Sequence, residues 1–351
     1  MSRGPMQLEC PIPDRGRDRI EMAHGGGGRA MRELISGLFR RHFDSPHLAA
    51  ETDAAVLPVA GSRVAFTTDT YVVQPLFFAG ADIGKLAVCG TVNDLATSGA
   101  VPRYLSCGFI LEEGLEREVL ERVVRSMAET AREAGVAIVT GDTKVVERSR
   151  GDGLYVNTAG VGDVPPGVEL GPAQLQPGDQ VLVTGDIGRH GVAVMAARDS
   201  LFGFDADVQS DCAPLAGLVR QLVESGVGLR CLRDLTRGGL GAALHELAEH
   251  RCLGLVVDER SVPVLDPVQG ACELLGLDPM FVANEGRMLV VTAADDADQA
   301  LELLRAHPDG AGAARIGEVV TTHPGSVTVT GLLGTDRVLD LPLGEQLPRI
   351  C

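Results

Sequence analysis

The sequence contains no tryptophan, and aromatic residues make up only 3% of the 351-residue chain. With 45% hydrophobic residues the chain is globular, and its cores must be built from Val, Leu, Ile and Ala. Basic residues are also in the minority, because 31 Lys and Arg against 48 Asp and Glu give a net charge of -17. Nucleic-acid binding needs clustered Lys and Arg, so no nucleic-acid partner is expected. ATP is still compatible, because it binds locally through a metal ion and backbone amides.

Long apolar runs and paired cysteine motifs are absent as well. No run of about eighteen apolar residues occurs, so we expect no membrane partner and no transmembrane helix. Residues 1–22 lack the apolar segment of a secretory signal, and we interpret them as a disordered leader. The eight cysteines show no CxxC spacing, which is typical of free thiols in the reducing cytoplasm.

Apolar periodicity predicts alternating helices and strands on both sides of a Pro- and Gly-rich linker at 165–178. Before it, helices are expected at 31–39, 86–96 and 119–131, the last ending at Gly135, and strands at 63–68, 105–111, 136–140 and 155–161. The alternation resumes with a strand at 180–184 and continues to Val338. We therefore predict an α+β fold, an α/β sandwich with an N-terminal domain at 23–168, a C-terminal domain at 178–340 and a flexible tail at 341–351.

Four aspartates in the N-terminal half follow apolar stretches, at positions that we expect to be loops: Asp53, Asp69, Asp94 and Asp142. Loops at strand ends commonly present ligands, and carboxylate oxygens are what Mg²⁺ prefers beside nucleotide phosphates. Each residue alone could equally cap a helix or stabilise a turn. Four of them in one half favour a shared metal site.

A run of four glycines follows His24 and includes Gly26 and Gly27. Because glycine has no Cβ, backbone amides in such a run can approach a phosphate closely. No GK[ST] follows, so the run is not a Walker A loop, and a flexible hinge is an equal alternative.

Three residues are candidates for the chemistry itself. Lys144 follows Asp142 and Thr143 in an expected loop, where its ammonium could balance a transferred phosphoryl group. Glu285 precedes an expected strand at 288–292 and is a candidate base, although a glutamate at such a turn is usually structural. Cys351 ends the chain on a tail that could reach roughly 25 Å, so its thiol could be loaded elsewhere and brought to an active site, unless the chain simply stops there.

Several strings, in this order, resemble the HypE family of hydrogenase maturation factors in the aminoimidazole ribonucleotide (AIR) synthetase, or PurM-like, superfamily. The resemblance runs from about Ile20 to Cys351. It is carried by HGGGG, TTDTYVVQPLFFAGADIGKLAVCGTVNDLATSGA, IVTGDTKVV, RDLTRGGL, LGLDPMFVANEG and the terminal PRIC. The chain departs from the family pattern at Thr52, where members often have a second Asp, and at Leu235, where they often have Pro.

The resemblance implies a two-domain PurM-like fold and an ATP-dependent carbamoyl dehydratase, which is a carbon–oxygen lyase. A HypF-like carbamoyltransferase would place the carbamoyl group on Cys351 as a thiocarbamate. Dehydration to a thiocyanate would then supply cyanide, through a HypC–HypD complex, to the iron of [NiFe]-hydrogenase. The resemblance also implies a homodimer formed through the N-terminal half.

The resemblance further implies roles for the candidate residues. Mg²⁺ and the ATP phosphates would be held by Asp53, Asp69, Asp94 and Asp142, assisted by Asn93, Thr143, Gly26 and Gly27. Lys144 would stabilise charge on the carbamoyl oxygen, Glu285 would take a proton from nitrogen, and Cys351 would carry the substrate. Because a thiocarbamate oxygen is a poor leaving group, ATP would first phosphorylate it.

Two other interpretations remain open. A different ATP-using relative, such as thiamine-phosphate kinase or selenophosphate synthetase, would share the Asp-rich half, but neither predicts a loaded terminal cysteine. A selenophosphate synthetase would also need a reactive cysteine near the glycine run, and Cys10 is poorly placed for this. A non-enzymatic, ATP-gated scaffold would not need Lys144, Glu285 and the four carboxylates together.

Overall fold

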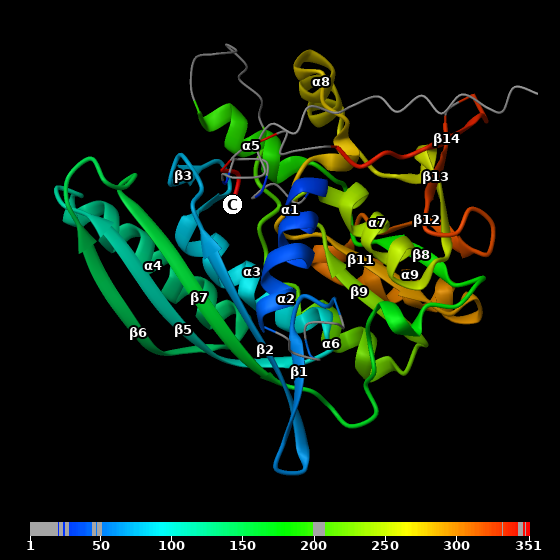
Figure 1. Ribbon diagram of the computed structural model, residues 1–351, viewed down its shortest axis with the longest axis horizontal. Coiled ribbons are helices and arrows are strands. Elements are labelled where there is room, and N and C mark those ends of the chain that lie inside the picture. The colour runs from blue at the N-terminus through cyan, green and yellow to red at the C-terminus, as the bar shows by residue number, and fades with distance from the viewer. Residues whose placement is uncertain are drawn as a thin grey trace, which may run out of the picture.

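The computed structural model describes residues 20, 24, 28–43, 47, 51–198, 208–331, 333–342, 347 and 349–351. Gly26 and Gly27 lie outside these residues, as does all of the expected leader except Ile20. Two large sheets, one in each half of the chain, organise the described part (Figure 1). Within these ranges, no helix has both the length and the apolar character that a membrane crossing requires.

The N-terminal half is built on a five-stranded sheet with the strand order β1-β2-β7-β5-β6. Its strands are β1 (Ala55–Val59), β2 (Ser62–Tyr71), β5 (Val101–Glu112), β6 (Ala137–Val146) and β7 (Leu154–Asp163). β5 and β6 pair in parallel, and the other neighbours are antiparallel. Helices α3 (Ile83–Thr97) and α4 (Arg117–Ala134) cover one face (Figure 1). The predicted end of α4 at Gly135 is confirmed, because this glycine adopts the left-handed conformation with φ 70°.

Helix α3 is the buried centre of the N-terminal half. The Asp82 carboxylate caps its first turn by accepting hydrogen bonds from the amides of Gly84 and Lys85, at 2.7 and 3.2 Å. Apolar side chains along the helix pack with the inner face of the sheet and with α4. The helix continues through a buried stretch to Thr97, so Asp94 lies inside it, in agreement with the helix predicted at 86–96 and not with the loop position expected for this aspartate.

Two other aspartates also lie in regular structure. Asp69 is within β2, because its neighbours pair with β7 up to Tyr71. The strand predicted at 136–140 is longer than expected, since β6 stays paired with β5 as far as Val146. Asp142, Thr143 and Lys144 are therefore strand residues, and the loop predicted for them is wrong. Asp53 lies in the bend that leads into β1.

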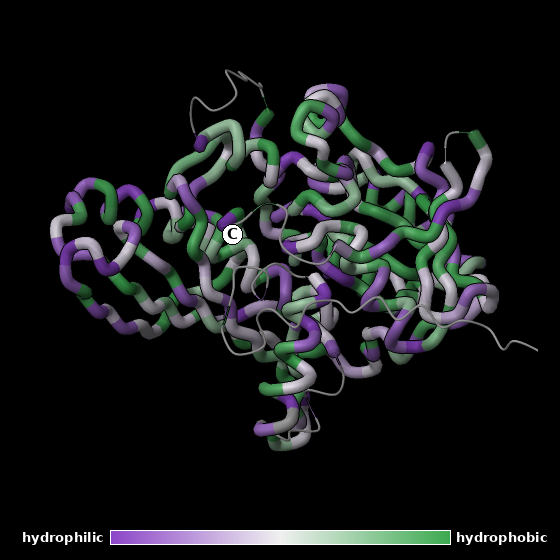
Figure 2. The backbone as a smooth tube through the Cα atoms, turned by 45° about the horizontal axis from the view of Figure 1, so that its top comes forward, coloured by the Kyte–Doolittle hydropathy of each residue, from purple (hydrophilic) through white to green (hydrophobic). Residues whose placement is uncertain are grey.

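The face of the N-terminal sheet opposite α3 and α4 carries exposed apolar side chains. Phe66, Tyr104 and Ile110 are 44%, 55% and 45% exposed. Phe66 and Tyr104 are both in register with Val161, so their side chains lie on the same face. Ile110 is an even number of residues from Tyr104 on β5 and is in register with Lys144, so both share this face. We call it the outer face, and it includes Phe66, Tyr104, Ile110, Asp142 and Lys144. Figure 2 shows hydrophobic and hydrophilic stretches alternating along this sheet.

The C-terminal half contains a seven-stranded sheet with the strand order β14-β13-β10-β12-β8-β11-β9. Its strands are β8 (Gln180–Val183), β9 (Leu229–Asp234), β10 (Gly254–Asp258), β11 (Met288–Thr292), β12 (Ala314–Val320), β13 (Val327–Thr330) and β14 (Asp336–Val338). The helices are α5 (Arg189–Ala197), α6 (Ala216–Ser225), α7 (Gly239–Arg251), α8 (Asp266–Leu275) and α9 (Ala297–Ala306).

Helices pack on both faces of this second sheet. On one face the apolar side chains of α7 join Val181 and Val291 in a buried core. On the other face α6 and α9 pack with Leu182 and Val290 in a separate core. The alternation of neighbouring residues between two cores is what a strand buried on both sides produces. The predicted α+β sandwich is confirmed.

The remaining elements are short. They are α1 (Arg29–Leu34), η2 (Ile35–Phe39), α2 (Arg40–Phe43), β3 (Phe77–Phe78), β4 (Ala81–Asp82), η4 (Pro172–Gln174), η5 (Glu259–Ser261), η6 (Pro279–Phe281), η7 (Ala294–Asp296) and η8 (Pro308–Gly310). The first three form the helix expected at 31–39. The C-terminus lies near the middle of the molecule, between the two halves (Figure 1).

Candidate active site

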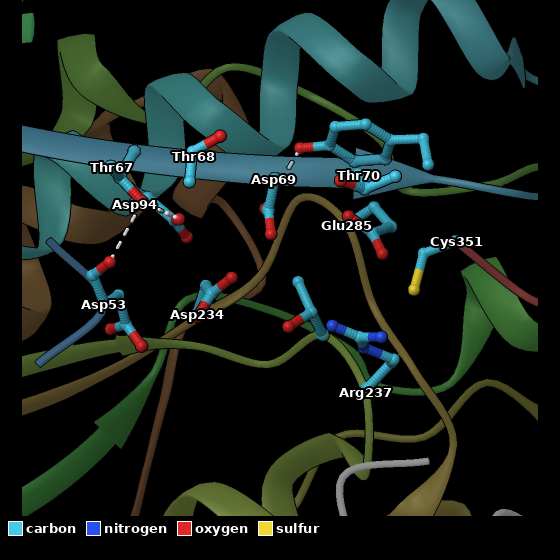
Figure 3. Close-up of a pocket in the computed structure, with 12 residues that line it drawn as sticks. Asp53, Thr67, Thr68, Asp69, Thr70, Asp94, Asp234, Arg237, Glu285 and Cys351 are labelled. Atoms are coloured by element: carbon cyan, nitrogen blue, oxygen red, sulfur yellow. Dashed lines mark hydrogen bonds between the residues drawn. The ribbon is translucent and has the colours of Figure 1, made fainter. Parts of the chain in front are cut away.

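A pocket of about 230 Å³ lies where the two halves meet and contains five of the eleven predicted site residues (Figure 3). The residues that line it are Asp53, Thr67, Thr68, Asp69, Thr70, Tyr71, Asp94, Asp234, Thr236, Arg237, Glu285 and Cys351. They come from the bend before β1, from β2 and α3, from the end of β9 and the loop after it, from the segment before β11 and from the C-terminus. The structure therefore brings together five of the predicted residues, which are far apart in the sequence: Asp53, Asp69, Asp94, Glu285 and Cys351.

The carboxyl groups of the pocket are crowded and shielded from water. Burial, followed by the neighbouring charges of Asp234 and Asp69, raises the pKa of Asp53 to about 7, although its ion pair with Arg233 at 2.6 Å acts in the opposite direction. Burial and the charge of Asp234 raise the pKa of Asp69 to about 6. Burial also holds the pKa of Asp94 well above its ordinary value. The pocket is therefore suited to a cation that would neutralise these groups.

Hydrogen bonds hold two of these carboxyl groups in place. The Thr67 hydroxyl donates to Oδ2 of Asp94 at 2.7 Å, and the Tyr71 hydroxyl donates to Oδ2 of Asp69 at 3.1 Å. Other acidic oxygens have no such partner, because Oδ2 of Asp53 and Oε1 of Glu285 are buried and accept no hydrogen bond from the described part of the chain. A buried oxygen without a donor is unfavourable unless a ligand or ion completes it.

The carboxylates of the pocket fit a magnesium ion that is bound partly by the phosphates of a nucleotide. Within the described ranges, no three acidic, histidine or cysteine side chains converge into a ready-made metal centre. Mg²⁺ commonly takes one or two carboxylates and fills its other positions with phosphate oxygens and water. Carboxylates spread along the wall of one pocket match that mode better than a cage made only of protein.

Asp234 was missed by the sequence reasoning. It is the last residue of β9, and Thr236 and Arg237 follow it in the pocket wall. Its charge raises the pKa of Asp69 and of Glu285, which shows that it belongs to the same electrostatic cluster. An acidic residue at the end of a strand, followed by Leu-Thr-Arg-Gly-Gly, resembles the signal that singled out the N-terminal aspartates, and it could have been read in the same way.

Glu285 is held in the pocket by the backbone around it. Its amide and that of Gly286 donate to Oδ2 of Asp211, at 3.2 and 2.9 Å. Burial, followed by the neighbouring Cys212, Asp234, Asp211 and Asp69, keeps the pKa of Glu285 well above its ordinary value. A carboxylate in these surroundings takes up a proton readily once it is ionised.

Asn93 does not line the pocket, although we expected it to assist the metal. Its amide nitrogen donates to the carbonyls of Ala213 and Glu285, at 3.0 and 3.4 Å, and its oxygen accepts from the amide of Leu215 at 2.7 Å. Asn93 is 3% exposed, and these three bonds tie α3 to the C-terminal half. It therefore positions the Glu285 segment.

Asp142, Thr143 and Lys144 lie on β6 and do not reach the pocket of their own chain. Lys144 Nζ forms an ion pair with Asp142 Oδ2 at 2.6 Å, and the two side chains are 69% and 71% exposed. The hydrogen bond from Lys144 and that from the Thr143 amide lower the pKa of Asp142. A single chain thus leaves Asp142 and Lys144 on the outer face of β6, the last strand of the sheet, whereas Thr143 is in register with Phe109 and lies on the other side of the strand.

The end of the chain is bound along the continuation of β2. The amide of Val72 donates to the Cys351 carbonyl at 3.1 Å, and the amide of Gln74 donates to the Arg349 carbonyl at 3.3 Å. Ile350 is 2% exposed and packs in the N-terminal core. In the view of Figure 3 the Cys351 thiol lies at the end of the pocket near Glu285 and Arg237.

Comparison with known proteins agrees with this architecture. The models for the N-terminal and C-terminal domains of AIR synthase related proteins match residues 51–164 and 176–330. The carbamoyl dehydratase HypE of Escherichia coli K12 is 51% identical over 339 residues, which cover 95% of this chain and 100% of that protein.

Two solved structures are also similar along most of the chain. The crystal structure of the hydrogenase maturation protein HypE in complex with ATP has a TM-score of 0.80 and 47% identity, and it covers 95% of this chain and 100% of its own. A chain of the HypE–HypF complex has a TM-score of 0.84 and 45% identity, and it covers 88% of this chain and 99% of its own.

Proposed function

The chain belongs to the HypE family of carbamoyl dehydratases, and from that premise we propose how its residues divide the reaction. The protein catalyses the ATP-dependent dehydration of a carbamoyl group, which supplies cyanide ligands for the iron of [NiFe]-hydrogenase during maturation. One observation carries the assignment of residues: the Cys351 side chain lines the same pocket as Glu285 and the buried aspartates. The kinase and scaffold alternatives are not favoured, because neither needs a terminal thiol at that place.

Cys351 carries the carbamoyl group as a thiocarbamate in this proposal. The carbamoyl oxygen attacks the γ-phosphorus of ATP, ADP leaves, and one N–H proton is released to solvent, so that carbon and nitrogen become doubly bonded. Glu285 then takes the remaining N–H proton. The electron pair of that N–H bond forms the third carbon–nitrogen bond, and the C–O bond breaks as phosphate leaves. Cys351 is left as a thiocyanate.

Glu285 suits the second proton transfer because its Oε1 atom is buried and accepts no hydrogen bond from the described residues. Its raised pKa makes the ionised form a strong base in a site shielded from water. Arg237 brings a positive charge to the same wall, where a phosphate leaving group would need one. Asn93 and Asp211 act on the reaction indirectly, by holding the Glu285 segment.

Asp53, Asp69 and Asp94 are the proposed magnesium ligands, with Asp234 as an addition from the structure. Their raised pKa values show that the ligand-free pocket disfavours so many negative charges. Bound there, Mg²⁺ would neutralise charge on the carboxylates and on the ATP phosphates. ATP binding itself follows from the family.

A homodimer would explain the position of Asp142 and Lys144 on the outer face. The outer face exposes Phe66, Tyr104 and Ile110, which a second copy of the sheet could cover. This face reaches the pocket along β2, because Thr68 and Thr70 share the side of Phe66 and also line the pocket. We propose that two outer faces pack together and that Lys144 of one chain acts in the pocket of the other.

Partners follow the order of the reaction. A HypF-like carbamoyltransferase is the proposed source of the carbamoyl group, supported by the structure of a HypE–HypF complex. A HypC–HypD complex is the proposed cyanide acceptor, in keeping with the family. The described cysteines are all free thiols, as the proposed location in a reducing cytoplasm requires.

The carrier role is tested by replacing Cys351 with Ala, and Cys252→Ala is the matched control because Cys252 is exposed and outside the pocket. After incubation with the carbamoyltransferase and ATP, mass spectrometry of the C-terminal peptide should show carbamoyl and cyano adducts in the wild type and in Cys252→Ala. Cys351→Ala should bind ATP normally but accept no carbamoyl group. Cyanide formation by Cys351→Ala would refute the carrier role.

A further inference from the structure

Helix α5 holds the end of the chain through His190, which is fully buried in the first turn of that helix. The Nε2 atom of His190 lies 2.9 Å from the Ile350 carbonyl oxygen, and Nδ1 lies 2.9 Å from the Ser210 hydroxyl. A carbonyl can only accept, so Nε2 carries the proton and donates it to Ile350. Burial lowers the pKa of His190 and favours the neutral ring, whose Nδ1 accepts from Ser210.

The surroundings of the ring hold it in one orientation. The Phe78 ring packs edge-on against it, with centroids 5.3 Å apart and planes at 86°. Ser210 is itself held from two sides, because its amide donates to the Ala79 carbonyl at 2.8 Å and its hydroxyl accepts from the Cys212 amide at 3.1 Å. The imidazole therefore bridges a fixed segment and the last peptide unit of the tail.

The same segment also supports the proposed base. Asp211 lies between Ser210 and Cys212, and its carboxylate accepts from the amides of Glu285 and Gly286. The contact is a close one between backbones, since a Cβ on Gly286 would come within 1.9 Å of the Asp211 carbonyl oxygen. Residues 210–212 thus touch the tail through His190 on one side and the Glu285 segment on the other.

We propose that His190 is the positioning residue of the carrier tail. It binds the carbonyl one residue before Cys351 and so sets how far the thiol enters the pocket. Through Ser210 it keeps the docked tail in register with Glu285. This inference rests on the proposed function, in which Cys351 carries the group that Glu285 deprotonates.

Other contacts of the tail do not replace this one. Gln74 and Val72 bind the tail through their backbone amides, and Arg198 donates from its side chain to the Arg349 carbonyl. The hydrogen bond from His190 is more deeply buried than these contacts, because His190 and Ile350 are shielded from water. Its loss would therefore leave the Ile350 carbonyl buried without a hydrogen-bond donor. Docking of the tail then becomes less favourable than it is in the wild type.

The test compares the alkylation of Cys351 by iodoacetamide in the full-length wild type, His190→Ala and His190→Gln, with each site quantified by peptide mass spectrometry. Cys252 is exposed and serves as the internal reference. Loss of one buried hydrogen bond should raise the Cys351 rate, relative to Cys252, by up to about tenfold in His190→Ala. His190→Gln should restore slow alkylation, because its amide can both donate to Ile350 and accept from Ser210. Equal ratios in wild type and His190→Ala would overturn the proposal.

Ser210→Ala tests the same proposal in case His190→Ala does not fold. Ser210→Ala removes the hydroxyl that orients the ring while keeping its size nearly the same, so it should raise the Cys351 rate by a smaller factor than His190→Ala. Thermal unfolding of both variants identifies any that fail to fold. If Ser210→Ala folds and leaves the ratio unchanged, the bridge through Ser210 is wrong.

A functional measurement separates positioning from general damage. With the tail already carbamoylated, His190→Ala should slow dehydration by ATP about tenfold, whereas loading by the carbamoyltransferase should be as fast as in the wild type. A change that merely destabilised the protein would slow both. If Cys351 proved not to be the carrier, the alkylation result would still decide whether His190 docks the tail. The two proposals can therefore fail separately.

Discussion

Replacing Asp53 with Asn should stabilise the ligand-free protein relative to the wild type increasingly as the pH rises, although Asn also loses the ion pair with Arg233. In the folded protein the pKa of Asp53 is raised from 3.8 to about 7, chiefly by burial. The folded state therefore keeps a proton that the unfolded state releases. Stability from this group is fully present below the unfolded pKa and is lost as the pH rises towards the folded pKa.

The size of the effect follows from that difference. At about 1.4 kcal/mol per pKa unit, the free energy of unfolding of the wild type falls by about 4 kcal/mol as the pH rises from the unfolded to the folded pKa of Asp53. About 3 kcal/mol of this decrease occurs between about pH 5 and about pH 8. Asp69, with a pKa raised to about 6, titrates in the same cluster, so the value for Asp53 alone is a ceiling. Asn cannot ionise and escapes this loss. We expect the stability gap to widen by about 1 to 3 kcal/mol.

Urea unfolding of the wild type and Asp53→Asn at several pH values measures this gap. Asp298→Asn is the matched control, because the Asp298 side chain is 82% exposed and lies outside the pocket. The difference in unfolding free energy between Asp298→Asn and the wild type should not grow with pH. Mg²⁺ with ATP should stabilise the wild type more at about pH 8 than at about pH 5, because the ligands must be ionised. A gap for Asp53→Asn that does not change with pH would refute the electrostatic account of the pocket.

Two further predictions concern the chemistry. Glu285→Gln should accept the carbamoyl group normally but dehydrate it about a hundredfold or more slowly, because the base is lost, and mass spectrometry of the tail would then show the carbamoyl adduct accumulating. Rapid formation of the cyano adduct would remove Glu285 from this role. Lys144→Ala and Glu285→Gln should each be inactive alone. In a mixed dimer, the pocket of the Lys144→Ala chain keeps its own Glu285 and receives Lys144 from the partner chain, so the cyano product should form on the tail of the Lys144→Ala chain. Mixed dimers without product would contradict the action of Lys144 across the interface.

Local patterns in the sequence were sufficient for much of the fold. The apolar stripe that stops at Gly135 predicted α4, because helix periodicity and a C-cap glycine depend on neighbouring residues only. Strand ends were harder to place. β6 runs past Thr140 through Gly141 to Val146 because its backbone pairs with β5, and that pairing partner is invisible to local periodicity.

The candidate site, like the fold, could be predicted from the sequence only in part. Residue type and position were enough to select Asp53, Asp69, Asp94, Glu285 and Cys351, which the structure gathers in one pocket. Asn93 was selected for the wrong contact, because its hydrogen-bond partners lie 120 or more residues away in the sequence. Lys144 was selected without any indication that it would lie on the outer face.

The sequence by itself determined the main helices and strands of the N-terminal half, the sandwich class and the family, because these depend on short-range periodicity and on contiguous motifs. Only the tertiary structure decided that Asp234 joins the aspartates and that His190 and Ser210 bind the tail beside Glu285. Those relations arise where two sheets and the chain end pack together. Burial and distance, which set the pKa values and the hydrogen bonds of the pocket, exist only after that packing.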